Sequence, residues 1–226
     1  MNYILNIQMG QIIFPKFFDL KMYKSVSYYD QIAESFLNES RTFSKAILDE
    51  SLSAKRIYSS EGAVSNFDIF LSHSYLDKKT VYGIYKDFES LGYNTYVDWI
   101  VDPNLDRNKI TKATAEILRT RMKQSKCLIY ATSSNILLSN WMPWELGFMD
   151  GLTASKVAVF PLLKAGQKDA DIELPKYLEL YFSCTKEKES KSCKDILWIN
   201  EATDTYISFS KWLYDNKQPY KRIRNA

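Results

Sequence analysis

Histidine is nearly absent from this sequence, because His73 is the only one among 226 residues. A metal site built from several histidines is therefore excluded, and we expect no Ser-His-Asp triad. The three cysteines, Cys127, Cys184 and Cys193, are odd in number and lack the spacing of metal ligands. This pattern favours free thiols in a reducing compartment. We therefore expect no bound metal and a cytoplasmic protein.

Long apolar runs are also missing. No stretch reaches the roughly 18 uninterrupted apolar residues of a membrane helix, and the first 18 residues lack the basic start of a signal peptide. The net charge is only +3 with both signs interspersed, which gives no electrostatic reason to expect a nucleic acid partner. The seven glycines form neither a dinucleotide fingerprint nor a phosphate loop, which counts against a dehydrogenase.

The N-terminal part of the chain has a helical pattern. With 46% hydrophobic residues, the chain can bury a sizeable core, and its length suits one domain with an appendage. From Ser25 to about Ser53, apolar residues recur at helical spacing. Their expected buried face consists of Tyr29, Ile32, Phe36, Phe43, Ile47 and Leu48. Gly62 and the serines of residues 59–65 favour a linker. We predict an N-terminal helical extension over residues 1–64, which packs on the main domain or meets a second chain, and the main domain over residues 65–226.

In the main domain, strand patterns alternate with helix patterns. Strands are expected at 67–72, 93–97, 127–132 and 157–163, and helices at 78–91, 110–124 and 141–152. This alternation predicts an α/β fold in which a parallel sheet is covered by helices on both faces. In the helix over 110–124, we expect the inward-facing residues to be Ile110, Ala113, Ile117, Leu118 and Met122.

Beyond residue 163 the pattern is less regular. A polar loop is expected at 166–171, a strand or helix at 177–182, and a charged surface loop at 186–194. A short strand at 196–199 and a helix over 203–214 complete the expected elements.

Polar residues follow three of the expected strands. In parallel α/β sheets, ligands bind beyond the carboxyl ends of the strands. The residues 72–74, 98–108 and 133–139 all leave such ends, and Glu145 lies near the start of the next helix. Trp141 and Glu145, four residues apart, share one face of that helix. Glu145 is either a functional carboxylate in this crevice or a solvated helix charge.

Two segments resemble bacterial TIR (Toll/interleukin-1 receptor) domains. Phe67-Asp-Ile-Phe-Leu-Ser-His-Ser74, followed by Asp77-Lys78, resembles the first box of that family. Ser139-x-Trp141-x-x-x-Glu145 resembles the segment that carries the catalytic glutamate of NAD-consuming TIR domains. Tyr96-Val97-Asp98 and the following loop are similar to the strand and BB loop of the family, although that loop lacks the glycine many members carry. The resemblance implies a flavodoxin-like fold.

The resemblance also implies an activity. It indicates an enzyme that cleaves the nicotinamide–ribose bond of NAD and releases nicotinamide with ADP-ribose or a cyclic ADP-ribose-type signal, in anti-phage defence. NAD is then the substrate, and no cofactor is expected. Nicotinamide leaves as a neutral molecule, so one carboxylate that opposes the developing oxocarbenium charge can do most of the work. The resemblance assigns that catalytic role to Glu145. The expected substrate-binding residues are Phe70, Ser72, His73, Ser74, Asp98, Trp99, Arg107 and Trp141.

Several alternatives remain open. His73 either contacts the ligand or caps the following helix, and Trp99 either stacks on a ligand or anchors its loop. Asp68, inside a strand, is expected to be structural and to hold a neighbouring loop. For the whole protein, the alternatives are a non-catalytic scaffold that acts through contacts between TIR domains and a sensor that binds nucleotides without cleaving them.

The expected partners are further copies of the chain and a separate effector protein that senses the product. Residues 98–108 carry Trp99, Ile100, Val101 and Leu105, more apolar surface than a solvated loop needs. We therefore expect this loop to reach a neighbouring subunit. The alternative is that these side chains fold back onto their own domain.

Overall fold

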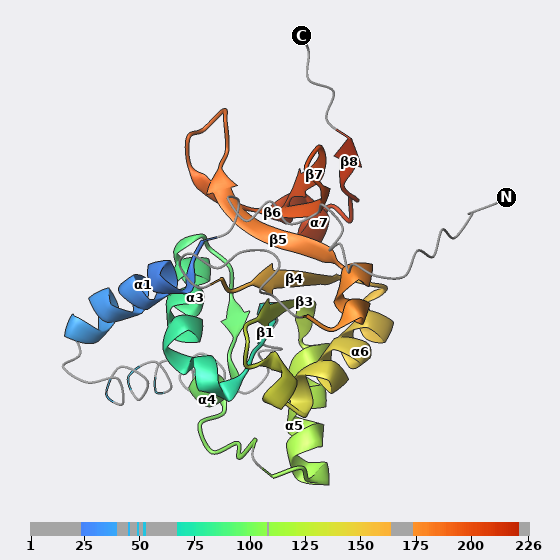
Figure 1. Cartoon of the computed structure of the whole chain (residues 1–226). Helices are drawn as coiled ribbons and strands as arrows, with labels where there is room; N and C mark the ends of the chain where they lie inside the picture. Colours follow the sequence, from blue (N-terminus) through green and yellow to red (C-terminus); the bar gives the residue numbers. More distant parts are fainter. Residues whose placement is uncertain are drawn as a thin grey trace, which may run out of the picture.

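The centre of the computed structural model is an eight-stranded sheet, drawn in Figure 1. The structure describes residues 24–39, 67–107, 109–163 and 174–221, with residues 45, 49 and 52. In these ranges the strand order is β2-β1-β3-β4-β5-β6-β7-β8. The first five strands run parallel: β1 Phe67–Ser72, β2 Thr95–Tyr96, β3 Ser125–Thr132, β4 Val157–Pro161 and β5 Phe182–Lys188. The order 2-1-3-4-5 is that of flavodoxin-like folds, so the predicted fold class is confirmed.

Three antiparallel strands extend the sheet beyond β5. They are β6 Asp195–Ala202, β7 Thr205–Ser208 and β8 Tyr220–Lys221. The helix predicted over 203–214 is therefore wrong in its first half, and only α7, Phe209–Tyr214, is helical. Ile207 fits both a helical and an alternating pattern, and pairing with Ile199 of β6 decides for the strand.

Helices cover both faces of the sheet. The longer ones are α1 Val26–Glu39, α3 Lys78–Ser90, α5 Lys112–Lys123 and α6 Trp141–Thr153, with a single turn, α4, at Asp98–Val101. The three helices predicted in the main domain are thus confirmed to within two residues at each end. Short 3-10 turns lie at η2 Tyr75–Asp77, η3 Ile136–Leu138 and η5 Lys176–Leu180, and the last resolves the segment predicted as strand or helix. None of the helices in the described ranges has the length and apolar character needed to cross a bilayer.

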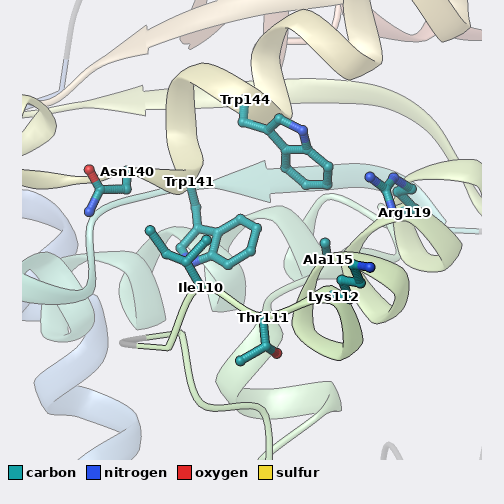
Figure 2. Close-up of a pocket in the computed structure, with 8 residues that line it drawn as sticks. All are labelled: Ile110, Thr111, Lys112, Ala115, Arg119, Asn140, Trp141 and Trp144. Atoms are coloured by element: carbon teal, nitrogen blue, oxygen red, sulfur yellow. The ribbon is translucent and has the colours of Figure 1, made fainter.

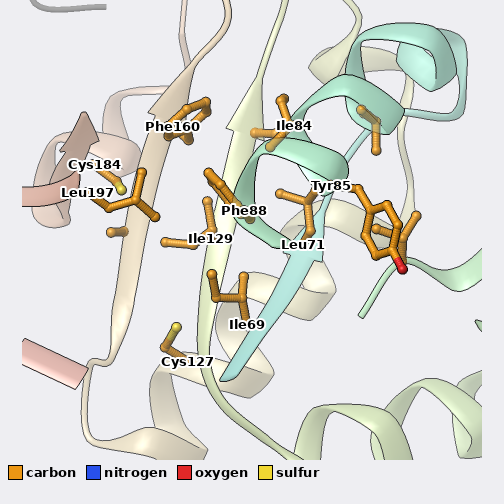
Figure 3. Packing of buried hydrophobic residues seen from close by; sticks show 14 of the residues in the cluster. Ile69, Leu71, Ile84, Tyr85, Phe88, Cys127, Ile129, Phe160, Cys184 and Leu197 are labelled. Atoms are coloured by element: carbon orange, nitrogen blue, oxygen red, sulfur yellow. The ribbon is translucent and has the colours of Figure 1, made fainter. Parts of the chain in front are cut away.

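One face of the sheet packs against α1, α3 and α7. Figure 3 shows Ile69 and Leu71 of β1, with Ile129 of β3, opposite Ile84 and Phe88 of α3. All five side chains are at most 1% exposed. Burying each large apolar side chain of this kind stabilises the fold by about 1.5–3 kcal/mol.

The other face packs against α5 and α6. From α5 the buried residues are Thr114, Leu118 and Met122, one helical turn apart. The predictions for Leu118 and Met122 are confirmed. Those for three other residues are wrong, because Ile110 precedes the helix and is 68% exposed, Ile117 is 40% exposed and Ala113 is also exposed. The buried stripe of α5 is narrower than its apolar composition suggested.

The N-terminal helix α1 packs directly on α3, beside which it lies in Figure 1. Tyr29 is completely buried, and Gly83 of α3 leaves room for the backbone of Tyr29. Of the face predicted to be buried, Ile32 is half-buried and Phe36 is 37% exposed, so the prediction for Phe36 is wrong. Phe43, Ile47 and Leu48, and the segments 59–65 and 166–171, lie outside the described residues. The domain boundary near residue 65 stays a prediction.

A buried ion pair joins α1, α3 and β5. Lys186 of β5 places Nζ 2.5 Å from Asp87 Oδ1 and 3.0 Å from the Tyr28 hydroxyl, with its side chain 5% exposed. The surface loop predicted over 186–194 is therefore wrong at its start, where β5 continues to Lys188. The carboxylate of Asp87 compensates the ammonium group, which otherwise could not be buried at acceptable cost.

Candidate active site

The candidate site lies where the strand order reverses. β1 has β2 on one side and β3 on the other, so the connections that leave their carboxyl ends diverge here, which is the position at which open parallel sheets bind ligands. Ser72 ends β1, Asp98 follows β2 directly after Val97, and α6 carries Glu145 after β3. The fold therefore brings together three segments that are far apart in the sequence.

Glu145 lies at the bottom of this arrangement. The side chain of Ser139 accepts a hydrogen bond from the Met142 N–H at 3.3 Å, and Pro143 stands in the first turn of α6, where its missing N–H costs nothing. The helix then carries Glu145 inward, with no exposed surface. The Ser72 hydroxyl donates a 2.6 Å hydrogen bond to Glu145 Oε2. The reading of Glu145 as a solvated helix charge is therefore wrong.

Arg107 bridges two carboxylates. One end of its guanidinium group donates to Glu145 Oε1, and the other donates to Asp98 Oδ2 at 2.9 Å. Burial alone would lower the pKa of Arg107, but the two carboxylates raise it above its usual value. Burial would likewise raise the pKa of Asp98, but the charge of Arg107 and its hydrogen bond to Asp98 hold it below the usual range. One guanidinium group thus lies between two acidic side chains, and this excess of acidic groups suits a ligand that becomes positive during reaction.

His73 is a neutral, buried imidazole. Its Nδ1 lies 2.8 Å from the carbonyl oxygen of Leu71, which can only accept, so Nδ1 carries the proton. Nε2 then accepts the Trp99 indole N–H at 2.9 Å. Burial lowers the pKa of His73, although Asp98, 3.4 Å away, opposes this shift. The capping role considered for His73 belongs to Ser74, whose hydroxyl accepts the Leu76 N–H at 3.4 Å.

The buried state of His73 predicts how stability depends on pH. The pKa of His73 in the folded protein lies below the unfolded value of about 6.5. The unfolded chain therefore binds more protons as the pH falls below about 6.5, so the free energy of unfolding should decrease there. Urea unfolding between about pH 7 and pH 5 measures this slope. In His73→Gln, which keeps an acceptor for Trp99, the slope should be smaller. An unchanged slope would contradict the neutral state, and the single histidine makes the assignment direct.

The segment after β2 folds inward rather than forming an open loop. Trp99, Ile100 and Val101 lie in α4 and are 7%, 0% and 7% exposed. The expectation that these side chains reach a neighbouring subunit is therefore wrong, and Trp99 anchors its own segment, as the alternative had it. Leu105 is partly buried against the same domain, and Asn108 lies outside the described residues.

Asp102 fixes the remainder of this segment and was missed in the sequence. It accepts two hydrogen bonds from Arg121 of α5, at 2.7 and 2.8 Å, and one from the Tyr96 hydroxyl at 3.0 Å. A bidentate pair of this kind holds both partners in a defined geometry. The segment that carries Arg107 is thus fastened at Asp102, on one side of Arg107. No sequence signal marked Asp102, because its partner lies 19 residues away in another element.

The other predicted site residues occupy different positions. Trp141 is 7% exposed and donates its indole N–H to the Arg107 carbonyl at 2.8 Å. Phe70 lies deeper, completely buried and stacked on Tyr96 with ring centroids 4.9 Å apart. Six of the predicted residues are connected with Glu145, either by hydrogen bonds or through the close approach of His73 to Asp98. The other two are not: Phe70 lies in the core, and Ser74 caps the turn that follows it. The connected residues are Ser72, His73, Asp98, Trp99, Arg107 and Trp141.

Two aspartates hold the loops around the site. Asp77 accepts hydrogen bonds from the Ser133 hydroxyl at 2.5 Å and the Asn135 amide at 2.7 Å, which join the segments after β1 and β3. Asp68 accepts the Asn94 N–H at 3.0 Å and pairs with Lys126 at 2.7 Å, so its predicted structural role is confirmed. The described ranges contain no group of three or more His, Cys, Asp or Glu side chains arranged to hold a metal ion.

Two bacterial proteins are similar to this chain, whereas no protein-family model matches it. The protein of Bacillus cereus (strain MSX-D12) named "Probable 3' cyclic ADP-D-ribose synthase ThsB'" is 39% identical over 188 residues, which are 83% of this chain and 93% of that protein. The protein of Cytobacillus dafuensis named "Putative cyclic ADP-D-ribose synthase TIR2" is 34% identical over 119 residues, 51% of this chain and 30% of that protein. The first similarity extends over most of both chains.

Proposed function

Because the chain belongs to the bacterial TIR-domain family of cyclic ADP-D-ribose synthases, we propose that it is an enzyme that cleaves the nicotinamide–ribose bond of NAD and makes a cyclic ADP-ribose-type signal in anti-phage defence. The observation that supports a catalytic rather than a scaffold role is the environment of Glu145. This carboxylate is completely buried beside Ser72 at the carboxyl end of β1, with its two oxygens held by Ser72 and Arg107.

Glu145 is the catalytic residue of the proposed reaction. As the bond between nicotinamide and the ribose carbon breaks, its electron pair leaves with the nicotinamide nitrogen, and the ribose becomes an oxocarbenium ion. No acid is needed, because nicotinamide departs neutral. A carboxylate beside the ribose stabilises the positive charge, and its oxygens accept hydrogen bonds from ribose hydroxyls. Attack by water then gives ADP-ribose, whereas attack by a hydroxyl of the same molecule gives a cyclic product, and either step releases one proton.

Arg107 and Ser72 act as positioning residues for this carboxylate. Ser72 fixes Oε2, while Arg107 covers Oε1, so a ribose hydroxyl that binds Oε1 must take the place of the guanidinium N–H. Asp98 can hold Arg107 during that exchange, because its 2.9 Å hydrogen bond uses the other guanidinium nitrogen. The Trp141 indole, bonded to the Arg107 carbonyl, would border the nicotinamide ribose.

The test is direct. We expect the purified protein to convert NAD into nicotinamide and an ADP-ribose product, separated by chromatography and identified by mass and by comparison with cyclic and linear standards. The mass distinguishes the two outcomes, because hydrolysis adds one water to the product. If the folded protein self-associates but shows no turnover under any condition, a scaffold role is favoured over an enzymatic one. Binding of NAD without turnover would favour a sensor.

We further propose that the protein works as a homo-oligomer through TIR–TIR contacts and that a separate effector protein senses the product. Residues 98–101 cannot supply such a contact, because their side chains are buried. Sedimentation during turnover tests it, since a monomer whose specific activity is independent of concentration would contradict it. A new nucleotide in infected cells that express the protein would support the signalling role.

A further inference from the structure

A pocket of about 390 Å³ lies beside the candidate site and was not expected from the sequence. Figure 2 shows it between the start of α5 and the first turn of α6. Its lining residues are Ile110, Thr111, Lys112, Ala115, Arg119, Asn140, Trp141 and Trp144. Its volume falls in the range of small-molecule sites, roughly 300–1,000 Å³.

The lining combines aromatic surface with positive charge. The indoles of Trp141 and Trp144 meet edge to face with centroids 5.4 Å apart, and Trp144 is only half-buried, so part of its ring remains accessible. Lys112 and Arg119 are cationic, and none of the lining residues is acidic. The pair between Arg119 and Glu116 is exposed and therefore weak. The guanidinium group of Arg119 also lies over the Trp144 ring, 5.4 Å from its centroid, so its charge stands directly beside the aromatic surface.

The start of α5 adds a third feature of the same sign. Thr111 caps this helix by accepting the Thr114 N–H at 3.1 Å, so the helix begins at Lys112 within the pocket lining. The first N–H groups of a helix and its dipole favour negative charge. An aromatic surface next to two cations and a helix start matches a nucleotide, because the base is planar and the phosphates are anionic.

Trp141 connects this pocket with Glu145. Its ring lines the pocket, and its N–H donates to the Arg107 carbonyl, while the Arg107 side chain reaches Glu145. Trp141 and Glu145 are four residues apart on α6, about one helical turn. A molecule that places its ribose at Glu145 can therefore extend past Trp141 into the pocket.

We propose that this pocket binds the adenosine diphosphate half of NAD. This proposal rests on the proposed function. The adenine packs against the accessible part of the Trp144 ring beside Arg119, and the diphosphate lies near Lys112, Arg119 and the start of α5. Trp144, Lys112 and Arg119 would then determine specificity for a dinucleotide over nicotinamide mononucleotide, which carries the same scissile bond but no adenylate.

The experiment compares NAD with nicotinamide mononucleotide in the full chain. The variants are Trp144→Ala and the double variant Lys112→Gln with Arg119→Gln. Lys123→Gln is the matched control, because Lys123 is exposed at the far end of the same helix. Trp144→Ala should raise KM for NAD roughly tenfold, the order expected when one base loses its aromatic partner. The double variant should also raise it roughly tenfold, the order expected when charged contacts to a phosphate are lost. kcat should stay within about twofold, and turnover of the mononucleotide should match that of the parent.

Binding of ADP, measured by calorimetry, gives a readout without catalysis. It should weaken about tenfold in both test variants and stay unchanged in Lys123→Gln. Because Lys112 is exposed, the double variant remains informative if Trp144→Ala fails to fold. Unchanged KM for NAD together with unchanged ADP binding would overturn the proposal, as would ADP that binds without competing with NAD. A parent that binds ADP at this pocket but never consumes NAD would refute the proposed function and leave the nucleotide site standing.

Discussion

Replacing Glu145 with glutamine is expected to lower the rate of NAD consumption by roughly a hundredfold or more, the usual cost of losing one electrostatic stabiliser of a transition state. Glutamine keeps the shape of the side chain and can still accept the Ser72 hydroxyl hydrogen bond, but it cannot oppose the oxocarbenium charge. Arg107 keeps its partner Asp98, so the variant should remain folded. The measurement is initial-rate chromatography of NAD and nicotinamide, with thermal unfolding recorded on the same samples.

Glu201→Gln is the matched control for that experiment. Glu201 is an exposed residue of β6, so this variant removes the same charge without touching the crevice. It should consume NAD at the parental rate. If Glu145→Gln also does so while remaining folded, the assignment of Glu145 as the catalytic residue is wrong.

Gly83→Ala is expected to destabilise the protein by about 3 kcal/mol, the upper end for added volume in a packed core. A Cβ on Gly83 would lie 2.7 Å from the carbonyl carbon of Tyr29 and closer still to its oxygen. Both neighbours are backbone atoms, which cannot turn away as a side chain can. Either α1 moves away from α3 or Tyr29 leaves its buried position, and urea unfolding measures the loss.

A glycine-to-alanine substitution elsewhere in the chain should leave the free energy of unfolding unchanged or raise it. Gly147, in the interior of α6, has nothing within 4 Å of its added Cβ. Alanine is favoured over glycine inside a helix by roughly 0.5–1 kcal/mol, so Gly147→Ala should be neutral or stabilising. If both variants unfold at the parental urea concentration, the close packing of α1 on α3 is not a feature of the protein in solution.

The position of the candidate site could be predicted because its signals are local. The apolar run Phe67–Ser72 and the polar residues after it mark a strand and its carboxyl end within eight residues. Pro143 and the apolar spacing after it mark α6, and the rule for ligand crevices then brings Ser72 and Glu145 together. Both the strand end and the helix are marked by residues that are close together in the sequence.

The partners of these residues could not be predicted in the same way. Arg107 is 38 residues from Glu145, and only the fold places its guanidinium group on that carboxylate. Residues 98–101 combine one acidic residue with three apolar ones, which is compatible with either a contact to another subunit or burial, and a single helical turn is what directs Trp99 and Ile100 inward. Lys186 is a similar case, since a lysine is normally exposed and its burial depends on Asp87 from a distant helix.

The two outer strands of the sheet, as far as the structure describes it, also bear on how copies of the chain can associate. β2 and β8 consist of two residues each, and β8 ends with Lys221. Such short edge strands, one of them ending in a lysine, offer few free backbone groups to a strand from another molecule. Natural sheets use short and charged edge strands to avoid aggregation. Neither edge of the described sheet is therefore suited to pairing with a strand of another copy.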